Sequence, residues 1–333
     1  MKILLTGGLG YIGSITAVKF IKSGYEVVIA DNLSNSKISV LDKIEKATGV
    51  RVKFYQVDIC DMGEFEKVFS ENKDIQAVIH FAGLKAVGES VRLPLKYYQN
   101  NLISTLNLLE MMQKYGVKNL IFSSSATVYD ASEKMPLTED SKLGATNPYG
   151  RTKLFIEQIL TDYQKANPDF NCTLLRYFNP IGASDDYLLG EDPNGVPNNL
   201  MPYICKVACG ELEKLNIFGN DYKTKDGTGV RDYIHVEDLA EGHLKAFEKM
   251  GSGSGLKIYN LGTGKGYSVL DIVTTFNRVN GDLVKYEFAA RRPGDVDECY
   301  ASPEKAEREL GFKAEKTLED MCKSSYLFKK NNK

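Results

Sequence analysis

Short hydrophobic runs alternate with amphipathic stretches along the first half of the chain. Six runs rich in β-branched residues predict strands, at Lys2–Thr6, Glu26–Ala30, Val52–Val57, Ala77–Phe81, Asn119–Ser123 and Cys172–Arg176. Between them, apolar residues recur with helical spacing at Ile12–Lys22, Ile38–Ala47, Met62–Ser70, Tyr97–Tyr115 and Gly150–Asn167. Strands that alternate with helices in this order predict an α/β fold with a doubly wound parallel sheet.

The pattern changes after Arg176. Glycine, proline, asparagine and aspartate crowd into Asn179–Pro202, and the regular alternation weakens. We therefore predict a nucleotide-binding domain over residues 1–177 and a second, smaller mixed α/β domain over residues 178–333.

The boundary between these domains is not a single cut. Val230–Val236 and Lys257–Leu261 have the composition of strands, and Glu237–Met250 has that of a helix. Segments near residues 230–262 are therefore expected to return to the first sheet. The glycine- and serine-rich Gly251–Gly255 is expected to be a flexible turn.

Composition narrows the classes of function. The chain has 333 residues, and 42 basic residues against 44 acidic ones give a net charge of −2, so nucleic acid is a poor candidate partner. The six cysteines are scattered without a C-x-x-C pair, which predicts reduced thiols and no metal site. No signal peptide and no apolar stretch long enough to span a membrane is present, so we expect a cytoplasmic protein.

The first predicted strand runs into a glycine-rich loop, Gly7-Gly8-Leu9-Gly10-Tyr11-Ile12-Gly13, and a helix follows at once. Glycines allow the tight turn and let the backbone approach a pyrophosphate, which the free N–H groups of the helix N-terminus then bind. This context favours a dinucleotide site over an ordinary turn.

Two aspartates extend this interpretation. The second strand leads to Asp31, about 20 residues after the loop, where a carboxylate holds the ribose hydroxyls of NAD and repels the extra phosphate of NADP. No arginine occurs in Asn32–Ser36, which also favours NAD. Asp58, after the third strand, has two interpretations that the sequence does not separate: an adenine contact, or the N-cap of the helix from Met62.

A second group of reactive side chains follows the fifth strand. Tyr149 and Lys153 are four residues apart in a predicted helix and therefore share a face. A tyrosine needs its pKa lowered by about three units to act as a base at neutral pH, and a neighbouring ammonium, together with oxidised nicotinamide, can supply the charge. The hydroxyls of Ser123–Ser125 and Thr127 lie where ligands bind in parallel sheets, and one of them can bind the same substrate oxygen.

At this point the chain resembles the extended short-chain dehydrogenase/reductases and, within them, the UDP-hexose 4-epimerases. The resemblance covers nearly the full length. The motifs that carry it are T-G-G-x-G-Y-I-G from Thr6, D-N-L-x-N-S from Asp31, H-F-A-G-L-K-A-V-G-E-S from His80, S-S-S-A-T-V-Y from Ser123, N-P-Y-G-x-x-K from Asn147, L-R-Y-F-N-P from Leu175, P-N-N-L-M-P from Pro197 and G-T-x-x-R-D-Y-I-H-V from Gly227.

The resemblance implies a Rossmann fold, bound NAD and a role for each matching residue. Tyr149 would be the acid/base, Lys153 would lower its pKa and hold the nicotinamide ribose, and Ser125 would bind the 4-hydroxyl of the sugar. The implied cofactor contacts are Gly7, Gly10, Tyr11, Ile12, Gly13, Asp31, Asn32, Leu33, Ser34, Asn35, Ser36, Asp58, Ile59, Phe81, Ala82, Lys85, Asn100, Ser123 and Phe178. The implied substrate contacts are Asn179, Asn199, Leu200, Asn216, Ile217, Phe218, Arg231, Tyr233, Arg292, Asp295 and Cys299.

The implied reaction is the reversible inversion of carbon 4 in UDP-glucose and UDP-galactose through a 4-keto sugar, a step of galactose metabolism. NAD would stay bound between turnovers. Cys299 stands where many relatives carry a larger tyrosine, which implies additional room for N-acetylhexosamines. The resemblance also implies a homodimer, formed by the helices at Tyr97–Tyr115 and Gly150–Asn167.

Other functions remain open at this stage. Nucleotide-sugar 4,6-dehydratases share the glycine loop and the tyrosine–lysine pair but carry Asp-Glu where this chain has Ala126 and Thr127, and uronate decarboxylases carry glutamate at Thr127. A uronate epimerase and a non-enzymatic NAD-sensing regulator are the further alternatives, and the regulator would have lost the catalytic set. Among the histidines, His80 and His235 are expected to be packed in the protein, and His243 to lie on the surface.

Overall fold

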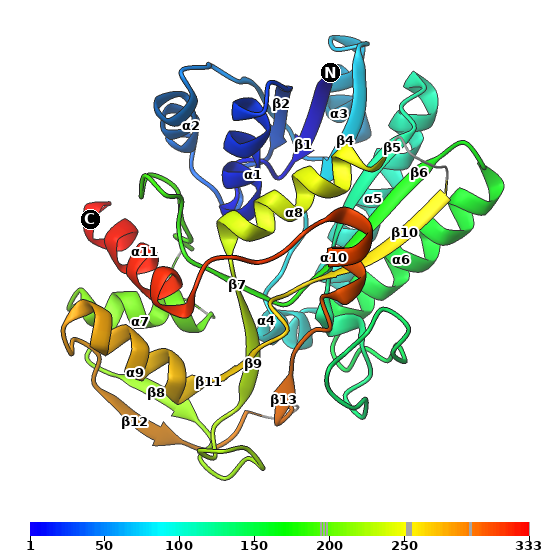
Figure 1. The fold of residues 1–333 in the computed structure, drawn as a ribbon. Coiled ribbons are helices and arrows are strands. Elements are labelled where there is room, and N and C mark those ends of the chain that lie inside the picture. Colours follow the sequence, from blue (N-terminus) through cyan, green and yellow to red (C-terminus); the bar gives the residue numbers. More distant parts are fainter. Residues whose placement is uncertain (194, 196, 198, 251–254, 293–294, 333) are drawn as a thin grey trace. The chain divides into compact units, whose positions relative to one another are not determined.

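The computed structural model describes residues 1–333 except 194, 196, 198, 251–254, 293–294 and 333, so most of the expected turn at Gly251–Gly255 lies outside the described residues. The chain divides into two compact units (Figure 1). Unit 1 comprises Met1–Asp130, Lys142–Arg176 and Ala240–Tyr259, and unit 2 comprises Ala131–Ser141, Tyr177–Leu239 and Asn260–Lys333.

The first sheet has seven strands in the order β10-β6-β5-β4-β1-β2-β3. Its strands are β1 (Lys2–Thr6), β2 (Glu26–Asp31), β3 (Lys53–Gln56), β4 (Ile75–His80), β5 (Asn119–Ser125), β6 (Asn171–Tyr177) and β10 (Gly255–Leu261). β1 pairs in parallel with β2 on one side and with β4 on the other, so the strand order reverses at β1. In a doubly wound sheet, ligands bind at the carboxyl ends of the strands beside such a reversal.

Helices cover this sheet because its central strands are apolar on both faces. Leu4, Val78 and Leu120 project from the strands into a core that also contains Phe65 and Ile156 from the helices. In Figure 1, α5 and α6 run beside each other along β5 and β6. The helices of unit 1 are α1 (Tyr11–Lys22), α2 (Val40–Thr48), α3 (Met62–Ser70), α4 (Val87–Arg92), α5 (Pro94–Tyr115) and α6 (Pro148–Ala166), with the 3-10 turn η1 (Ala126–Val128). α8 (Val236–Glu248) begins in unit 2 and continues in unit 1.

Unit 2 is built on a small mixed sheet. In this sheet β9 is central, antiparallel to β11 and parallel to β13 and β7, and β12 pairs in parallel with β8 separately. Ile204, Ile272, Phe276 and Met321 are buried in its core. Its elements are β7 (Asn179–Ile181), α7 (Leu200–Ala208), β8 (Leu215–Phe218), β9 (Val230–His235), β11 (Gly266–Ser268), α9 (Val269–Asn280), β12 (Tyr286–Ala289), β13 (Glu298–Cys299), α10 (Glu304–Leu310) and α11 (Leu318–Asn331).

The predicted α/β class is confirmed, and each of the six strands predicted in the first half is present. The strand at Val230–His235 belongs to the unit 2 sheet, whereas Gly255–Leu261 joins the first sheet beside β6. The short helix α4 was not predicted, because its six residues include glycine and serine and show little helical periodicity. Among the described residues, no helix is both long enough and apolar enough to cross a membrane.

Candidate functional site

The glycine-rich loop makes a turn that side chains would obstruct. Gly7 has a φ of +67°, and a Cβ there would lie 2.8 Å from the backbone nitrogen of Ala82. A Cβ on Gly13 would lie 2.5 Å from the carbonyl oxygen of Gly7. α1 starts at Tyr11, and the residue before it, Gly10, has no side chain to cap the helix. Its first N–H groups are therefore suited to bind an anion.

Asp31 holds this loop against the end of β2. Its carboxylate accepts hydrogen bonds from the backbone N–H of Leu9 at 3.1 Å and of Leu33 at 2.9 Å, and from the hydroxyl of Ser36 at 2.8 Å. The side chain is only 7% exposed. The predicted ribose-binding aspartate thus also fixes two backbone segments, including Leu33 in a left-handed conformation with a φ of +61°.

Asp58 is not a helix cap. Its carboxylate accepts hydrogen bonds from the backbone N–H of Cys60 and from the side-chain amide of Asn32. The N-cap of α3 is Asp61, which accepts from the N–H of Glu64 at 3.0 Å, because α3 begins three residues too late for Asp58 to reach it. The capping interpretation is therefore wrong, and the adenine interpretation stays a prediction.

Other predicted cofactor contacts surround the end of β4. The backbone N–H groups of Phe81 and Ala82 both donate to the carbonyl of Thr6, at 3.0 and 3.1 Å. Asn101, which the sequence did not single out, holds the following loop by donating to the carbonyl of Leu84 and accepting from its N–H. The remaining predicted contacts differ in position: Tyr11, Ile12 and Asn100 are half-buried, Asn32, Ser34, Asn35 and Lys85 are exposed, the side chain of Ile59 is buried in the core, and Phe178 belongs to unit 2.

The serine cluster and the tyrosine–lysine pair lie together in unit 1. Lys153 is buried on α6, donates from Nζ to the carbonyl of Ser123 at 2.6 Å and lies 4.7 Å from the centroid of the Phe122 ring. Burial lowers the pKa of Lys153 to about 8.

Tyr149 lies one helical turn before Lys153, as the sequence predicts. Burial raises the pKa of Tyr149, and a hydrogen bond with Ser125 opposes that rise. The expected lowering of this pKa is therefore not produced by the chain's own groups, because desolvation of the phenolate outweighs them.

In unit 2, β9 brings several predicted substrate contacts together. Its register pairs Arg231 with Cys299 of β13 and Tyr233 with Asn179 of β7. Between these positions Asp232 is fully buried, and its carboxylate accepts from Thr263, Gly264 and Ala301. Asp232 was not predicted as a site residue, because it directly follows the charged Arg231 in a strand that also ends in His235, and nothing in that pattern marks it as buried.

The other predicted substrate contacts lie on β8, on α7 and near residue 292. The guanidinium of Arg292 lies 4.2 Å from the centroid of the Phe218 ring, a cation–π contact. Arg231 approaches Asp295 at 3.5 Å. Asn216 is half-buried and Ile217 is buried beside Phe218 on β8, Asn199 donates to Glu191 at 2.6 Å, and Leu200 opens α7.

Two of the three histidines are packed as predicted, and the third was mispredicted. His80 is buried, and its ring nitrogens contact the hydroxyls of Thr6 at 2.7 Å and Thr105 at 3.2 Å. His243 was expected on the surface but is fully buried, with its ring centroid 5.0 Å from that of Phe81. It lies on the inward face of α8, one turn after Leu239 and Ala240, so the helical spacing identifies it as buried.

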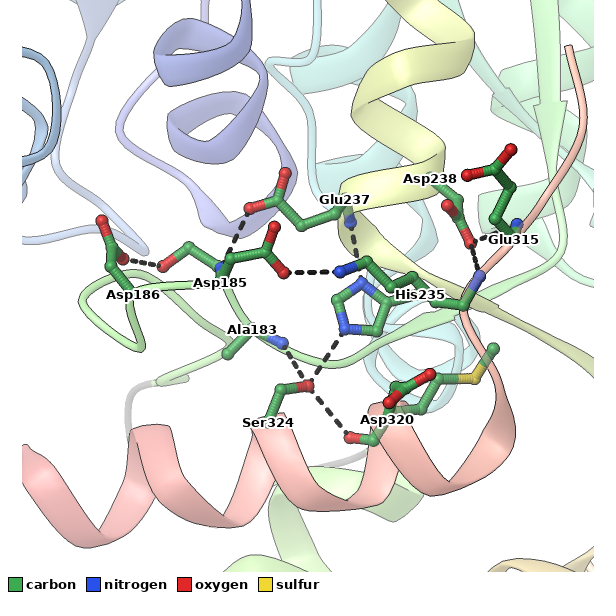
Figure 2. Close-up of polar contacts among 12 residues, drawn as sticks. Ala183, Asp185, Asp186, His235, Glu237, Asp238, Glu315, Asp320 and Ser324 are labelled. Carbon is green, nitrogen blue, oxygen red and sulfur yellow. Dashed lines mark hydrogen bonds and ion pairs between the residues drawn. The ribbon is translucent and has the colours of Figure 1, made fainter.

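His235 links β9 to the C-terminal helix (Figure 2). Its Nδ1 accepts from the backbone N–H of Glu237 at 3.1 Å, so Nε2 carries the proton and donates to Ser324 on α11, also at 3.1 Å. The Ser324 hydroxyl oxygen also accepts from the N–H of Ala183. This geometry makes His235 a neutral structural link.

We expect His235 to make the protein sensitive to acid. Burial, assisted by Lys316 and opposed by Asp185 and Asp320, lowers the pKa of His235 to about 4. Because the unfolded chain binds this proton more readily, the stabilisation is complete above the ordinary pKa of about 6.5 and is lost as the pH falls toward 4.

When the pH falls from 7.5 to 5, protonation linked to His235 should lower the free energy of unfolding by about 2 kcal/mol. Urea denaturation at both pH values should therefore show a smaller drop for His235→Gln than for the parent. Burial also lowers the pKa of His80, but its contribution to the drop is the same in both proteins and cancels in the comparison. Equal drops would contradict the prediction.

Comparison with known proteins agrees with this geometry. A family model described as GDP-mannose 4,6 dehydratase matches residues 4–325. A UDP-glucose 4-epimerase from Bacillus subtilis is 59% identical over 332 residues, which cover 100% of this chain and 98% of that relative. The crystal structure of a Bifidobacterium longum UDP-glucose 4-epimerase, in complex with NAD+ and UDP, is 51% identical with a TM-score of 0.97, covering 100% of this chain and 99% of that one. The chain belongs to the UDP-glucose 4-epimerase family.

A similar solved structure has a name that covers two kinds of sugar. A UDP-Glc/GlcNAc 4-epimerase from Campylobacter jejuni is 38% identical with a TM-score of 0.86, over 99% of both chains. Within the described part of this chain, no three side chains of the metal-binding types gather into a group.

Proposed function

We propose that the protein interconverts UDP-glucose and UDP-galactose by inverting carbon 4, with NAD retained between turnovers. Membership of the UDP-glucose 4-epimerase family over the whole chain supports this reaction. The observation that carries the proposal is the arrangement in unit 1, where Tyr149 contacts Ser125 and Lys153 is anchored one turn away on the same helix.

The residues of unit 1 fit a dinucleotide. The uncapped start of α1 and the close backbone packing at Gly7 suit a pyrophosphate, and the carboxylate of Asp31 suits ribose hydroxyls. When bound, NAD supplies a reversible acceptor for the hydrogen of carbon 4.

The chain's own residues supply the proton chemistry. Tyr149, as phenolate, takes the proton of the 4-hydroxyl, and Ser125 binds the same oxygen. Burial alone raises the pKa of Tyr149. With NAD bound, the ammonium of Lys153 and the positive charge of oxidised nicotinamide would together lower it. Arg231 and Arg292 would bind the diphosphate, which would leave the hexose free to turn.

The test uses UDP-galactose with deuterium at carbon 4 and no added NAD. We expect UDP-glucose that keeps the label at carbon 4, because the hydrogen leaves and returns within one active site. Loss of the label to the solvent, or a requirement for added NAD, would contradict the proposal.

A dehydratase reaction is the second candidate, because the matching family model has that description. Elimination of water needs an additional acid/base pair, but Ala126 has no ionisable group and Thr127 donates its hydroxyl to Ser125 at 3.0 Å. A 4-keto-6-deoxy sugar among the products would favour dehydration.

We further propose that N-acetylhexosamines are accepted, and that Cys299 provides the room. Cys299 is half-buried and pairs in register with Arg231, the expected diphosphate ligand. Cys299→Tyr should lower kcat/KM for UDP-N-acetylgalactosamine by roughly 10-fold or more, because a bulky side chain excludes the acetamido group, with little change for UDP-galactose. Both substrates should be assayed side by side on both proteins. Equal behaviour of the two proteins would refute this role.

We also propose a homodimer through an apolar face of α5 and α6. Leu95, Ile103, Leu106 and Phe155 are between 39% and 72% exposed on these helices, a grouping typical of a protein interface. Light scattering should give a dimeric mass for the parent and a monomeric mass for Leu106→Asp, since a carboxylate buried in that face would be unpaired. Val50→Asp changes an equally exposed apolar residue elsewhere and should stay dimeric. A monomeric parent would contradict the proposal.

A further inference from the structure

A buried ion pair lies next to the tyrosine–lysine pair in unit 1. Arg176 of β6 donates to both carboxylate oxygens of Glu157 on α6, at 3.0 Å from Nε and 2.7 Å from Nη2. The two side chains are only 1% and 5% exposed. Arg176 also donates to the hydroxyl of Tyr129 at 3.0 Å. A fully desolvated pair contributes little net stability, so its presence calls for another explanation.

Helical spacing connects this pair to the reactive residues. Tyr149, Lys153 and Glu157 occupy positions i, i+4 and i+8 of α6 and therefore lie along one face. The strand β5 contacts this face at successive residues. The carbonyl of Ser123 accepts from Lys153 at 2.6 Å, and the hydroxyl of Ser124 donates to Glu157 at 2.5 Å. The next residue is Ser125.

We propose that Glu157, held in place by Arg176, is a positioning residue that keeps Lys153 in its ammonium form and fixes β5 so that Ser125 meets Tyr149. This inference rests on the proposed function and extends it to two residues that do not touch the substrate. The carboxylate of Glu157 supplies the negative charge that opposes the lowering of the Lys153 pKa by burial.

The other ionisable groups around this helix face do not supply that charge. On α6 itself the neighbour is the phenol of Tyr149, and from β4 it is the buried, neutral His80. β6 contributes the cation Arg176 and the buried thiol of Cys172, whose pKa burial and Glu157 raise. From α5 the neighbour is Tyr97, which faces Tyr149. Glu157 is thus the one carboxylate among the described groups that act on Lys153.

The first test is the pH dependence of kcat in Glu157→Gln. Glutamine keeps the shape of the side chain and removes its charge, so the pKa of Lys153 falls and the alkaline limb of the profile moves toward acid by about one pH unit. Asp162→Asn removes an exposed carboxylate from the same helix and should leave the profile unchanged. Ser124→Ala keeps both charges and should lower kcat by a few fold without moving the limb.

A variant with an unpaired buried arginine can fail to fold. The double variant Glu157→Gln/Arg176→Met removes both charges together and should fold, and its alkaline limb should move in the same direction. An unchanged limb in the folded variants would overturn the proposal, because a merely structural ion pair would change stability and not this pH dependence.

A direct readout separates this inference from the proposed function. NMR titration of isotope-labelled lysine side chains, with Lys153 assigned by Lys153→Arg, should show the Lys153 pKa lower in Glu157→Gln than in the parent. An equal pKa in both would overturn the inference whatever the enzyme's substrate. If the Lys153 pKa differs between the two proteins as expected but the parent converts no UDP-hexose, only the proposed function is refuted.

Discussion

Replacing Tyr149 with phenylalanine is expected to lower kcat for UDP-galactose by roughly 100- to 10,000-fold. The ring stays in its half-buried place on α6, so only the hydroxyl that is proposed to exchange the proton is lost. A coupled assay for UDP-glucose measures the loss. Bound NAD, measured by the absorbance of purified protein, should be unchanged.

Tyr163→Phe is the matched control. Tyr163 lies on the same helix and packs its ring against Phe170 at a centroid distance of 4.9 Å. Removing its hydroxyl should leave kcat near the parent value. Full activity of Tyr149→Phe would refute the assignment of this phenol as the acid/base.

The second large effect is expected at the glycine loop. In Gly7→Ala the new methyl group would meet the backbone of Ala82 at 2.8 Å while φ stays at +67°. We expect a loss of about 2 to 4 kcal/mol in unfolding free energy, and purified protein with little NAD, because the loop that is proposed to bind the pyrophosphate must shift.

Gly49→Ala isolates the backbone contribution. Gly49 ends α2 with a nearly equal φ of +73°, but a Cβ there meets nothing within 4 Å. Gly49→Ala should lower the free energy of unfolding by about 1 kcal/mol and leave the NAD content unchanged. If both variants lost NAD alike, crowding at Ala82 would not be the cause.

The first unit could be predicted from the sequence because its signals are local. The strand Lys2–Thr6, the glycine loop and the helix from Tyr11 are consecutive, and each has its own spacing of apolar residues or glycines. Tyr149 and Lys153 could be paired because a helix fixes their separation.

Several features depend on contacts between distant residues and were missed. Glu157 and Arg176 each look like surface charges in isolation, and only the packing of α6 against β5 and β6 buries them together. α9 and α11 were missed although Ser268 with Asp271, and Thr317 with Asp320, form capping boxes that the sequence displays.

The carboxylate of Asp31 limits how the protein can be redesigned. A change of coenzyme to a phosphorylated dinucleotide calls for removing this carboxylate and adding an arginine for the extra phosphate. In this chain that exchange would also leave the N–H groups of Leu9 and Leu33 without their acceptor, so the turn before α1 would lose a tether. If Asp31 also binds the ribose as predicted, coenzyme preference and loop architecture are coupled through one side chain, and a successful conversion needs a compensating acceptor at that position.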